Sequence, residues 1–400
     1  MTVSLVRLGD VAAFIRGITF KPEDKIEPNS TDAVVCMRTK NVQDILDQDD
    51  LIAIPQPFVK RKEQYLFEGD LLVSTANSWE LVGKSCWVPK LSYQATAGGF
   101  ISILRSDREK IFPRYLYHWM NSSETLHQLR YCGRQTTNIS NMSLDLACDL
   151  ELPLPPLLEQ KRIAAILDKA DAIRRKRQQA VKLTEELLRS VFLDMFGDPV
   201  TNPKGWEVKS LAEEITFMTS GSRGWAEYYS DHGSKFIRIQ NVKNGQLHFN
   251  DVQYVKAPDN KEAARTKVQE NDLLISITAD LGRTAVVDKQ TADEGAHINQ
   301  HLALVRLSNA INPHFVAAYL ESQGGKSQFL QLDQSAVKSG LNFDSIKSLH
   351  LYNPPFVLQK QYAAAVESVE NTKVKLKDAA DTSDTLFTSL LQRAFRGELS

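Results

Sequence analysis

The stretch Asn353-Pro354-Pro355-Phe356 holds the side chains of this sequence that are best suited to chemistry. An amide can donate and accept hydrogen bonds, and an aromatic ring offers a face on which a planar group can stack. Two consecutive prolines also suit a rigid, extended entry to a helix, because they disfavour helix before them and preset its first turn. The surrounding sequence has to decide between a catalytic site and a helix start.

The tetrapeptide resembles the active-site sequence of adenine amino-methyltransferases. That resemblance implies an amide that holds the exocyclic amine of a flipped-out base and a ring that stacks on it. Such an enzyme also needs a strand, a glycine-bearing turn and a helix to seat its methyl donor, and residues 221–224 lack the apolar strand before them. No GxxxxGK[ST] motif and no metal-ligand spacing of histidines occurs. The sequence therefore favours the helix start.

The chain contains an internal repeat with a period of about half its length. Pro155 aligns with Pro354, and 354 − 155 = 199. The offset stays between 199 and 202 at five places in the same order, which indicates duplication. The matched segments are 154–171 with 353–370, 37–44 with 237–244, 67–74 with 269–276, 82–88 with 281–287, and 111–120 with 311–320.

Each half is predicted to be a globular part followed by one long helix. Apolar runs of strand length at 70–76 and 272–279, and again at 98–105 and 301–307, predict strands, and Pro113 and Pro313 suit the first turn of a helix. The fold class is mixed α/β (α+β). The expected parts are a globular domain at 1–152, a long helix at 153–200, a second globular domain at 201–351 and a C-terminal long helix at 352–400.

The two long helices are free of Pro and Gly from Glu159 to Phe196 and from Leu358 to Arg396. Each run of ~38 residues makes a rod of about 57 Å at 1.5 Å per residue. Apolar and small residues recur at steps of three and four, which predicts an antiparallel coiled coil with an approximate two-fold axis between the halves. The predicted interface residues are Ile163, Ile166, Ala170, Ile173, Leu187, Tyr362, Val369, Leu376, Leu386 and Leu390. The alternative is that each helix packs only on its own globular part.

The chain resembles the specificity subunits of type I restriction-modification systems over essentially its whole length. The resemblance rests on "PPLLEQKRIAAILDKAD" and its weaker copy "PPFVLQKQYAAAVESVE", on "FLDMFGDP" after the first helix, and on "LLQRAFRGEL" at the C-terminus. The second copy departs from the pattern, with Leu358 where the first has Glu159.

This resemblance implies two target-recognition domains, each of which reads one part of a split, asymmetric DNA sequence, with the helical pair as spacer. It also implies a non-catalytic subunit that binds double-stranded DNA, two modification (methyltransferase) subunits and restriction (translocase/endonuclease) subunits. No cofactor is expected on this chain, and S-adenosylmethionine, ATP and Mg²⁺ are expected in the partner subunits. The alternatives are a DNA-binding scaffold of a related phage-defence complex and a self-sufficient adenine methyltransferase.

Candidate DNA-contacting residues are polar side chains in segments that the repeat places at equivalent positions, or in polar loops. An equally weighted alternative is that the two asparagines are turn residues and that Arg38 and Arg238 form surface salt bridges. Shared positions suit backbone contacts best, because residues that read sequence should differ between the halves. The candidates are Arg38, Lys40, Asn41, Arg134, Gln135, Thr136, Arg238, Gln240, Asn241, Lys338 and Ser339.

The basic cluster at 174–177 has three interpretations: a solvated helix face, a phosphate contact or a docking surface. Arg177 lies on the predicted seam, where we expect it to reach an acidic partner.

The formal net charge of −1 argues against a free-standing nucleic-acid coat, so DNA contacts must come from local patches or from a basic partner. The chain shows no signal peptide and no membrane span, and its four cysteines are expected to be buried thiols rather than metal ligands. A cytoplasmic protein is expected.

Overall fold

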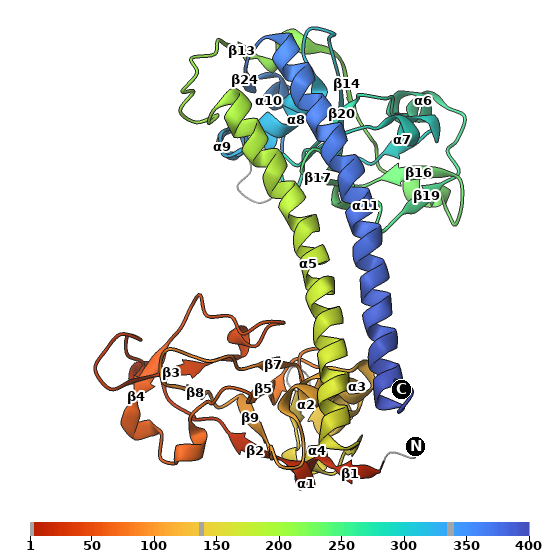
Figure 1. The fold of residues 1–400 in the computed structure, drawn as a ribbon. Helices are drawn as coiled ribbons and strands as arrows, with labels where there is room; N and C mark the ends of the chain where they lie inside the picture. The colour runs from red at the N-terminus through yellow and green to blue at the C-terminus, as the bar shows by residue number, and fades with distance from the viewer. Residues whose placement is uncertain (1–3, 136–139, 334–339, 400) are drawn as a thin grey trace. The chain divides into compact units, whose positions relative to one another are not determined.

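The computed structural model describes residues 4–135, 140–333 and 340–399 (Figure 1). The chain forms two compact units, of which the first comprises Met1–Gln178 with Asp378–Ser400 and the second Gln179–Lys377. Each unit therefore combines a globular part with one segment of each long helix.

The two long helices begin and end where the sequence signals predict. Helix α5 covers Leu157–Phe196 and helix α11 covers Phe356–Phe395, each with 40 residues, and each directly follows a Pro-Pro pair. Gly197 directly follows α5, and Gly397 lies two residues after the end of α11; their φ values of +82° and +75° are typical of helix termination, and glycine adopts them without strain. The helix-start interpretation of residues 353–356 is confirmed.

Within each unit, the segments of α5 and α11 run in opposite directions. In the first unit, Arg162 near the start of α5 donates to the carbonyl of Leu399, beyond the end of α11. In the second unit, the Glu185 carboxylate lies 3.2 Å from Lys373 Nζ, while the ring of Phe192, further along α5, contacts Tyr362, earlier in α11. The predicted antiparallel pairing is therefore present in both units.

The first unit contains a four-stranded antiparallel sheet in the order β2-β9-β5-β7. Beside it lie a three-stranded sheet, β4-β3-β8, in which β3 and β8 are parallel, and the smaller groups β10-β11-β6 and β1-β12. The strands are β1 (Leu5–Arg7), β2 (Ala12–Arg16), β3 (Ala33–Met37), β4 (Ala53–Pro55), β5 (Leu71–Ser74), β6 (Ala76–Asn77), β7 (Ser85–Trp87), β8 (Ala95–Ala97), β9 (Ile101–Ser106), β10 (Gly133–Gln135), β11 (Ser140–Met142) and β12 (Glu151–Pro153).

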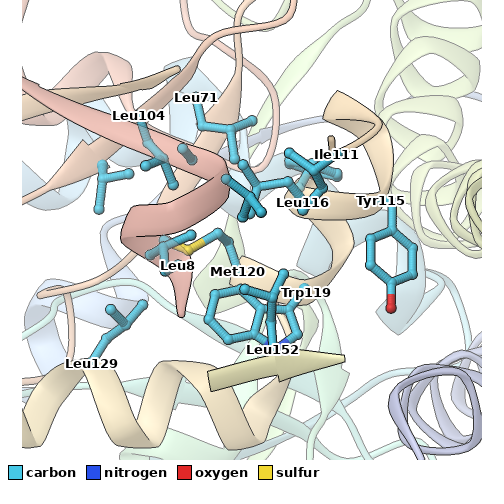
Figure 2. Packing of buried hydrophobic residues seen from close by; sticks show 14 of the residues in the cluster. Leu8, Leu71, Leu104, Ile111, Tyr115, Leu116, Trp119, Met120, Leu129 and Leu152 are labelled. Carbon is cyan, nitrogen blue, oxygen red and sulfur yellow. The ribbon is translucent and has the colours of Figure 1, made fainter. Parts of the chain in front are cut away.

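Helices of the first unit cover its four-stranded sheet and enclose its core. Figure 2 shows this core, where Leu71 and Leu104 of the sheet pack with Tyr115, Leu116 and other buried residues. Leu391 and Ala394 of α11 belong to the same cluster, so the C-terminal helix is built into this core. The short helices are α1 (Leu8–Val11), α2 (Pro113–Met120), α3 (Ser123–Tyr131) and α4 (Leu144–Cys148).

The second unit repeats this topology, with a four-stranded sheet in the order β14-β23-β20-β21. A second sheet, β15-β19-β16-β22, contains a parallel pair, β16 and β22, and two strand pairs, β13-β24 and β17-β18, complete the unit. The strands are β13 (Val208–Ser210), β14 (Ile215–Ser220), β15 (Tyr229–Ser230), β16 (Ser234–Ile237), β17 (Val242–Lys243), β18 (Gln246–Leu247), β19 (Gln253–Val255), β20 (Leu273–Ser276), β21 (Thr284–Val286), β22 (His297–Ile298), β23 (Leu302–Leu307) and β24 (His350–Tyr352).

The core of the second unit gathers Phe192 and Phe196 of α5, Tyr362 of α11 and Phe315 into one aromatic cluster. Each long helix thus contributes large apolar side chains to this core, as α5 and α11 do in the first unit. The short helices are α6 (Lys261–Thr266), α7 (Lys289–Asp293), α8 (Pro313–Glu321), α9 (Gln323–Leu332) and α10 (Phe343–Lys347).

The predicted repeat extends to a buried ion pair beside each main sheet. Asp70 is 3 % exposed and lies 2.6 Å from the Arg105 guanidinium, and Asp272 is 2 % exposed and lies 2.9 Å from Arg306. Both pairs bridge equivalent strands, with the acid just before β5 or β20 and the arginine in β9 or β23. Matching topology together with matching buried charges confirms the mixed α/β fold with two similar globular parts.

Candidate nucleic-acid interface

A short turn follows equivalent strands in the two units, and the two turns together carry six of the predicted DNA contacts. The turn after β3 is the 3₁₀ helix Thr39–Asn41, and the turn after β16 is the 3₁₀ helix Ile239–Asn241. We call the segments 38–50 and 238–251 the recognition turns.

Asn41 and Asn241 hold these turns together from the inside. Asn41 Oδ1 accepts from the backbone N–H of Arg38 at 2.8 Å, and Asn241 Oδ1 accepts from that of Arg238 at 3.0 Å. Their Nδ2 groups donate to the carbonyls of Asp47 and His248, at 3.0 and 2.8 Å. Because the two asparagines are 0 % and 2 % exposed, they cannot reach a base edge. This corrects their prediction as DNA contacts in favour of the turn-residue alternative.

The charged side chains of the recognition turns converge on one aspartate in each unit. In the first, Arg38 Nη2 donates to the Asp50 carbonyl at 2.7 Å, and Lys40 pairs with the Asp50 carboxylate. In the second, Arg238 Nη2 lies 2.9 Å from Asp251 Oδ2. The hydrogen bonds from Lys40 and then Arg38 hold the pKa of the exposed Asp50 carboxyl below its usual value. The salt-bridge alternative for the arginines thus describes their geometry, and their contact with DNA stays a prediction.

Sequence reasoning missed both aspartates. The available signal was the repeat itself, because Asp50 ends "DQDD" and Asp251 ends "HFND", with 251 − 50 = 201. This recurrence marks the acid as a shared feature of the two halves, but it does not name its partner.

The remaining predicted contacts lie beside or within the two internal segments, 136–139 and 334–339, that are outside the described residues. Arg134 and Gln135 belong to β10, where their backbones pair with Asn141 and Ser140 of β11, and nothing is described of their side chains. Thr136, Lys338 and Ser339 lie outside the described residues. These five stay predictions.

The predicted helix-pair interface is displaced along part of its length. Ile163 and Tyr362 are buried, and Ile166, Ala170, Val369, Leu376 and Leu390 are partly buried. Ile173, Leu187 and Leu386 are exposed by 47 %, 49 % and 56 %, which corrects their assignment.

The physical reason for this correction is that the middle of the helix contact is polar. Gln178 Nε2 donates to Asp384 Oδ1 at 3.1 Å, and the buried Ser383 accepts from Arg177. The Arg174 guanidinium stacks over the Phe387 ring at 5.2 Å. At two places the inward residue therefore lies one position after the predicted apolar one: Arg174 follows Ile173, and Phe387 follows Leu386.

The basic cluster at 174–177 is mostly engaged inside the first unit. Arg174 and Arg175 both bind Asp171, which is 6 % exposed, at 2.8 and 2.6 Å. Arg175 Nη1 also donates to the carbonyl of Asp44 at 2.8 Å, which ties α5 to the first recognition turn. Arg177 binds the Ala379 carbonyl and the Ser383 hydroxyl instead of an acid, so the expectation of an acidic partner for it is wrong. By exposure, Lys176 and Arg177 fit the solvated-face interpretation, whereas Arg174 and Arg175 are partly buried.

A hollow lies beside the long helices in each unit. The first, of about 430 Å³, is lined by residues that include Asp44, Ser122 and Phe387, and the second, of about 850 Å³, by residues that include Asn244 and Ser322. Asp44 and Asn244, like Ser122 and Ser322, are repeat equivalents at an offset of 200. The duplication therefore extends to the surface beside the helices.

Three further properties bear on the kind of site. Within residues 4–135, 140–333 and 340–399, no three His, Cys, Asp or Glu side chains are grouped so that they could hold a metal ion. No helix in these ranges combines the length and hydropathy that crossing a bilayer requires. Cys36, Cys86 and Cys132 are buried free thiols, whereas Cys148 is partly exposed.

Comparison with known proteins agrees with this architecture of two similar globular units, each built around paired helices. Residues 2–183 and 203–381 each match the family described as "Type I restriction modification DNA specificity domain". The chain belongs to this family, and it is a type I restriction-modification specificity subunit.

Individual relatives match over nearly the whole chain. The specificity subunit of the type I restriction enzyme StySPI from Salmonella potsdam is 25 % identical, and that of EcoKI from Escherichia coli (strain K12) is 24 % identical. Each match covers 98 % of this chain and 88 % of the relative. The crystal structure of a type I restriction-modification S subunit from M. genitalium has a TM-score of 0.60 at 13 % identity and covers 98 % of this chain and 96 % of that one, which shows the shared fold.

Proposed function

We propose that this chain reads a bipartite, asymmetric DNA target on behalf of a type I restriction-modification complex. The domain at 1–152 reads one half-site, the domain at 201–351 reads the other, and the long helices at 153–200 and 352–400 form the spacer. Members of its family are the non-catalytic, DNA-recognising components of these complexes. The methyltransferase and endonuclease activities accordingly belong to partner subunits.

One observation carries the proposal: the two units repeat the same recognition turn on the same fold but carry different exposed side chains. Arg38 and Arg238 recur, as do the buried asparagines, whereas Lys40 is replaced by Gln240. A duplicated frame with unlike surface residues is suited to reading two different sequences. Because the formal net charge of the chain is −1, it reads these sequences through local contacts and with the help of basic partners.

The length of the helices supports the spacer role. Forty residues at 1.5 Å per residue make about 60 Å, whereas one turn of B-DNA takes about 34–36 Å. Bases between the half-sites then go unread.

The partners follow from the same proposal. The chain binds double-stranded DNA, two modification subunits and restriction subunits, and it has no membrane partner. The equivalent hollows beside the helices support two copies of the modification subunit, because a duplicated surface offers the same site twice. S-adenosylmethionine, ATP and Mg²⁺ act in these partners, and the complex works in the cytoplasm.

Co-expression of the chain with the modification and restriction subunits of its system tests the proposal. Mapping of adenine methylation across the host genome is expected to give one split motif with two unlike halves and a constant gap. The chain alone, incubated with S-adenosylmethionine and DNA, is expected to transfer no methyl group. A contiguous motif, or methyl transfer by the isolated chain, contradicts the proposal.

A further inference from the structure

The first four residues of the two recognition turns, 38–41 and 238–241, share their hydrogen-bond frame but differ at one exposed position. Besides the asparagine bonds, the backbone N–H of Asp47 donates to the Asn41 carbonyl at 2.9 Å, and that of His248 donates to the Asn241 carbonyl at 2.8 Å. Position 40 in the first turn therefore corresponds structurally to position 240 in the second. A side chain there is presented from the same backbone geometry in both units.

Accessibility singles out this position within residues 38–41 and 238–241. The asparagines are buried, and the Arg38 and Arg238 side chains are 29 % and 21 % exposed. Thr39 and Ile239 differ between the units but are only partly exposed. Lys40 and Gln240 are exposed, so within residues 38–41 and 238–241 they are the pair that both differs and faces solvent.

The tethering aspartate determines which donors and acceptors remain available. Lys40 gives one of its three N–H donors to Asp50 and keeps two donors with no acceptor. Gln240 Nε2 donates to Asp251 Oδ2 at 2.6 Å, and because an ionised carboxylate only accepts, this contact orients the amide. The amide keeps one N–H donor and the Oε1 acceptor.

These two patterns match the major-groove edges of different purines. Guanine presents two acceptors, O6 and N7, whereas adenine presents the N7 acceptor and the N6 amino donor. We propose that position 40/240 is a base-reading position, with Lys40 reading guanine in one half-site and Gln240 reading adenine in the other. This inference rests on the proposed function and adds to it the residue and the base.

The aspartates act as positioning residues in this scheme. Long side chains lose rotamer freedom when they bind, and a side chain already held by Asp50 or Asp251 loses less. Each aspartate thus preorganises its reader.

Reciprocal exchange of the two readers tests the proposal in the full complex. The variants Lys40→Gln and Gln240→Lys, with Lys90→Gln and Gln290→Lys as exposed controls outside the turns, are each assembled with the partner subunits. Each complex is then used to select from double-stranded DNA with randomised half-sites. K40Q is expected to change one guanine to adenine in one half-site, and Q240K one adenine to guanine in the other, each with a change in preference of about 10- to 100-fold.

The outcomes separate this inference from the proposed function. If the wild-type complex selects no split motif, the proposed function fails. If the wild type selects one but K40Q and Q240K leave both halves unchanged, or weaken a half-site for every base alike, base reading at position 40/240 is overturned. A change of a single letter confined to one half-site supports it, provided that K90Q and Q290K select the wild-type motif.

Discussion

Gln160 Oε1 accepts a hydrogen bond from the backbone N–H of Phe112 at 2.7 Å, at the start of α2. Gln359 Oε1 makes the same contact with Asn312 at the start of α8, at 2.9 Å. Both glutamines are 1 % exposed, and each also donates at 2.8 Å to the carbonyl of the first proline before its own long helix. The shared glutamine of the two "PPxxxQ" segments thus joins each long helix to its globular part.

Loss of this contact is expected to destabilise the unit that contains it. Gln160→Leu leaves the Phe112 N–H and the Pro155 carbonyl buried without a partner, which costs about 1–3 kcal/mol of unfolding free energy. Lys161→Ala, at the exposed neighbouring position, is the control and should change stability by less than about 0.5 kcal/mol. Urea unfolding of the two variants measures the difference. Equal stability would mean that the glutamine does not join helix and domain.

Arg38 is expected to hold a DNA phosphate, because it recurs as Arg238 and a shared residue does not distinguish the half-sites. Arg38→Gln should weaken binding to all sequences at one half-site to a similar degree and reduce the salt slope of the affinity by about 1. Titration of the assembled complex with target DNA at several salt concentrations measures this. An unchanged salt slope with a changed base preference would assign Arg38 to sequence reading instead.

Arg134 and Gln135 lie where β10 pairs with β11 in the first unit. Their substitution by alanine should change or weaken recognition of one half-site, since the other half-site is read by the second unit. Methylation mapping with each variant shows which half of the motif changes. Equal loss at both half-sites would argue against direct readout by these residues.

Helix length is expected to set the unread gap. A seven-residue insertion into both α5 and α11 adds about 10 Å, or roughly three base pairs at 3.4 Å each. Both half-sequences should stay as they are while the gap between them widens. The same insertion in α5 alone is the control, because it mismatches the paired helices and should reduce assembly. An altered half-sequence with an unchanged gap refutes the spacer role.

His297 is expected to make the second unit sensitive to acid. Burial, and then the nearby Lys267 cation, lower the pKa of this imidazole to about 4 from 6.5. A group whose folded pKa is depressed takes up its proton more readily when unfolded, so stability falls as pH drops from 6.5 towards 4. The loss reaches about 3 kcal/mol at the lower end, since one pKa unit corresponds to about 1.36 kcal/mol.

His297→Gln tests this dependence. Burial also lowers the pKa of His118, His248 and His314, so the difference between wild type and variant isolates the His297 contribution. Unfolding can be followed by tryptophan fluorescence, because the Trp225 ring lies 5.2 Å from His297. The variant should lose less stability than the wild type between pH 6.5 and 4.5. Parallel pH profiles would show that His297 does not titrate within this range.

Local signals predicted the elements of this fold well because they act over a few residues. Apolar runs at 70–76 and 272–279 became β5 and β20, and Pro-Pro pairs and glycines delimit both long helices. The repeat offset predicted that the two globular parts share a topology. Periodicity predicted antiparallel pairing of the helices but not which face of each helix is buried at its middle. There Ile173 is exposed, while Asp171 is buried between two arginines.

The sequence by itself determined the duplication, the long helices and the family resemblance, because these are properties of order and spacing along the chain. Only the tertiary structure decided that Asn41 lies inside its turn, that Lys40 faces solvent and that Asp50 holds it. The physical reason is that exposure and hydrogen-bond partners depend on residues brought together by folding, and nine positions separate Asn41 from Asp50. Adjacent polar residues look alike in a sequence, whereas packing gives each of them a different role.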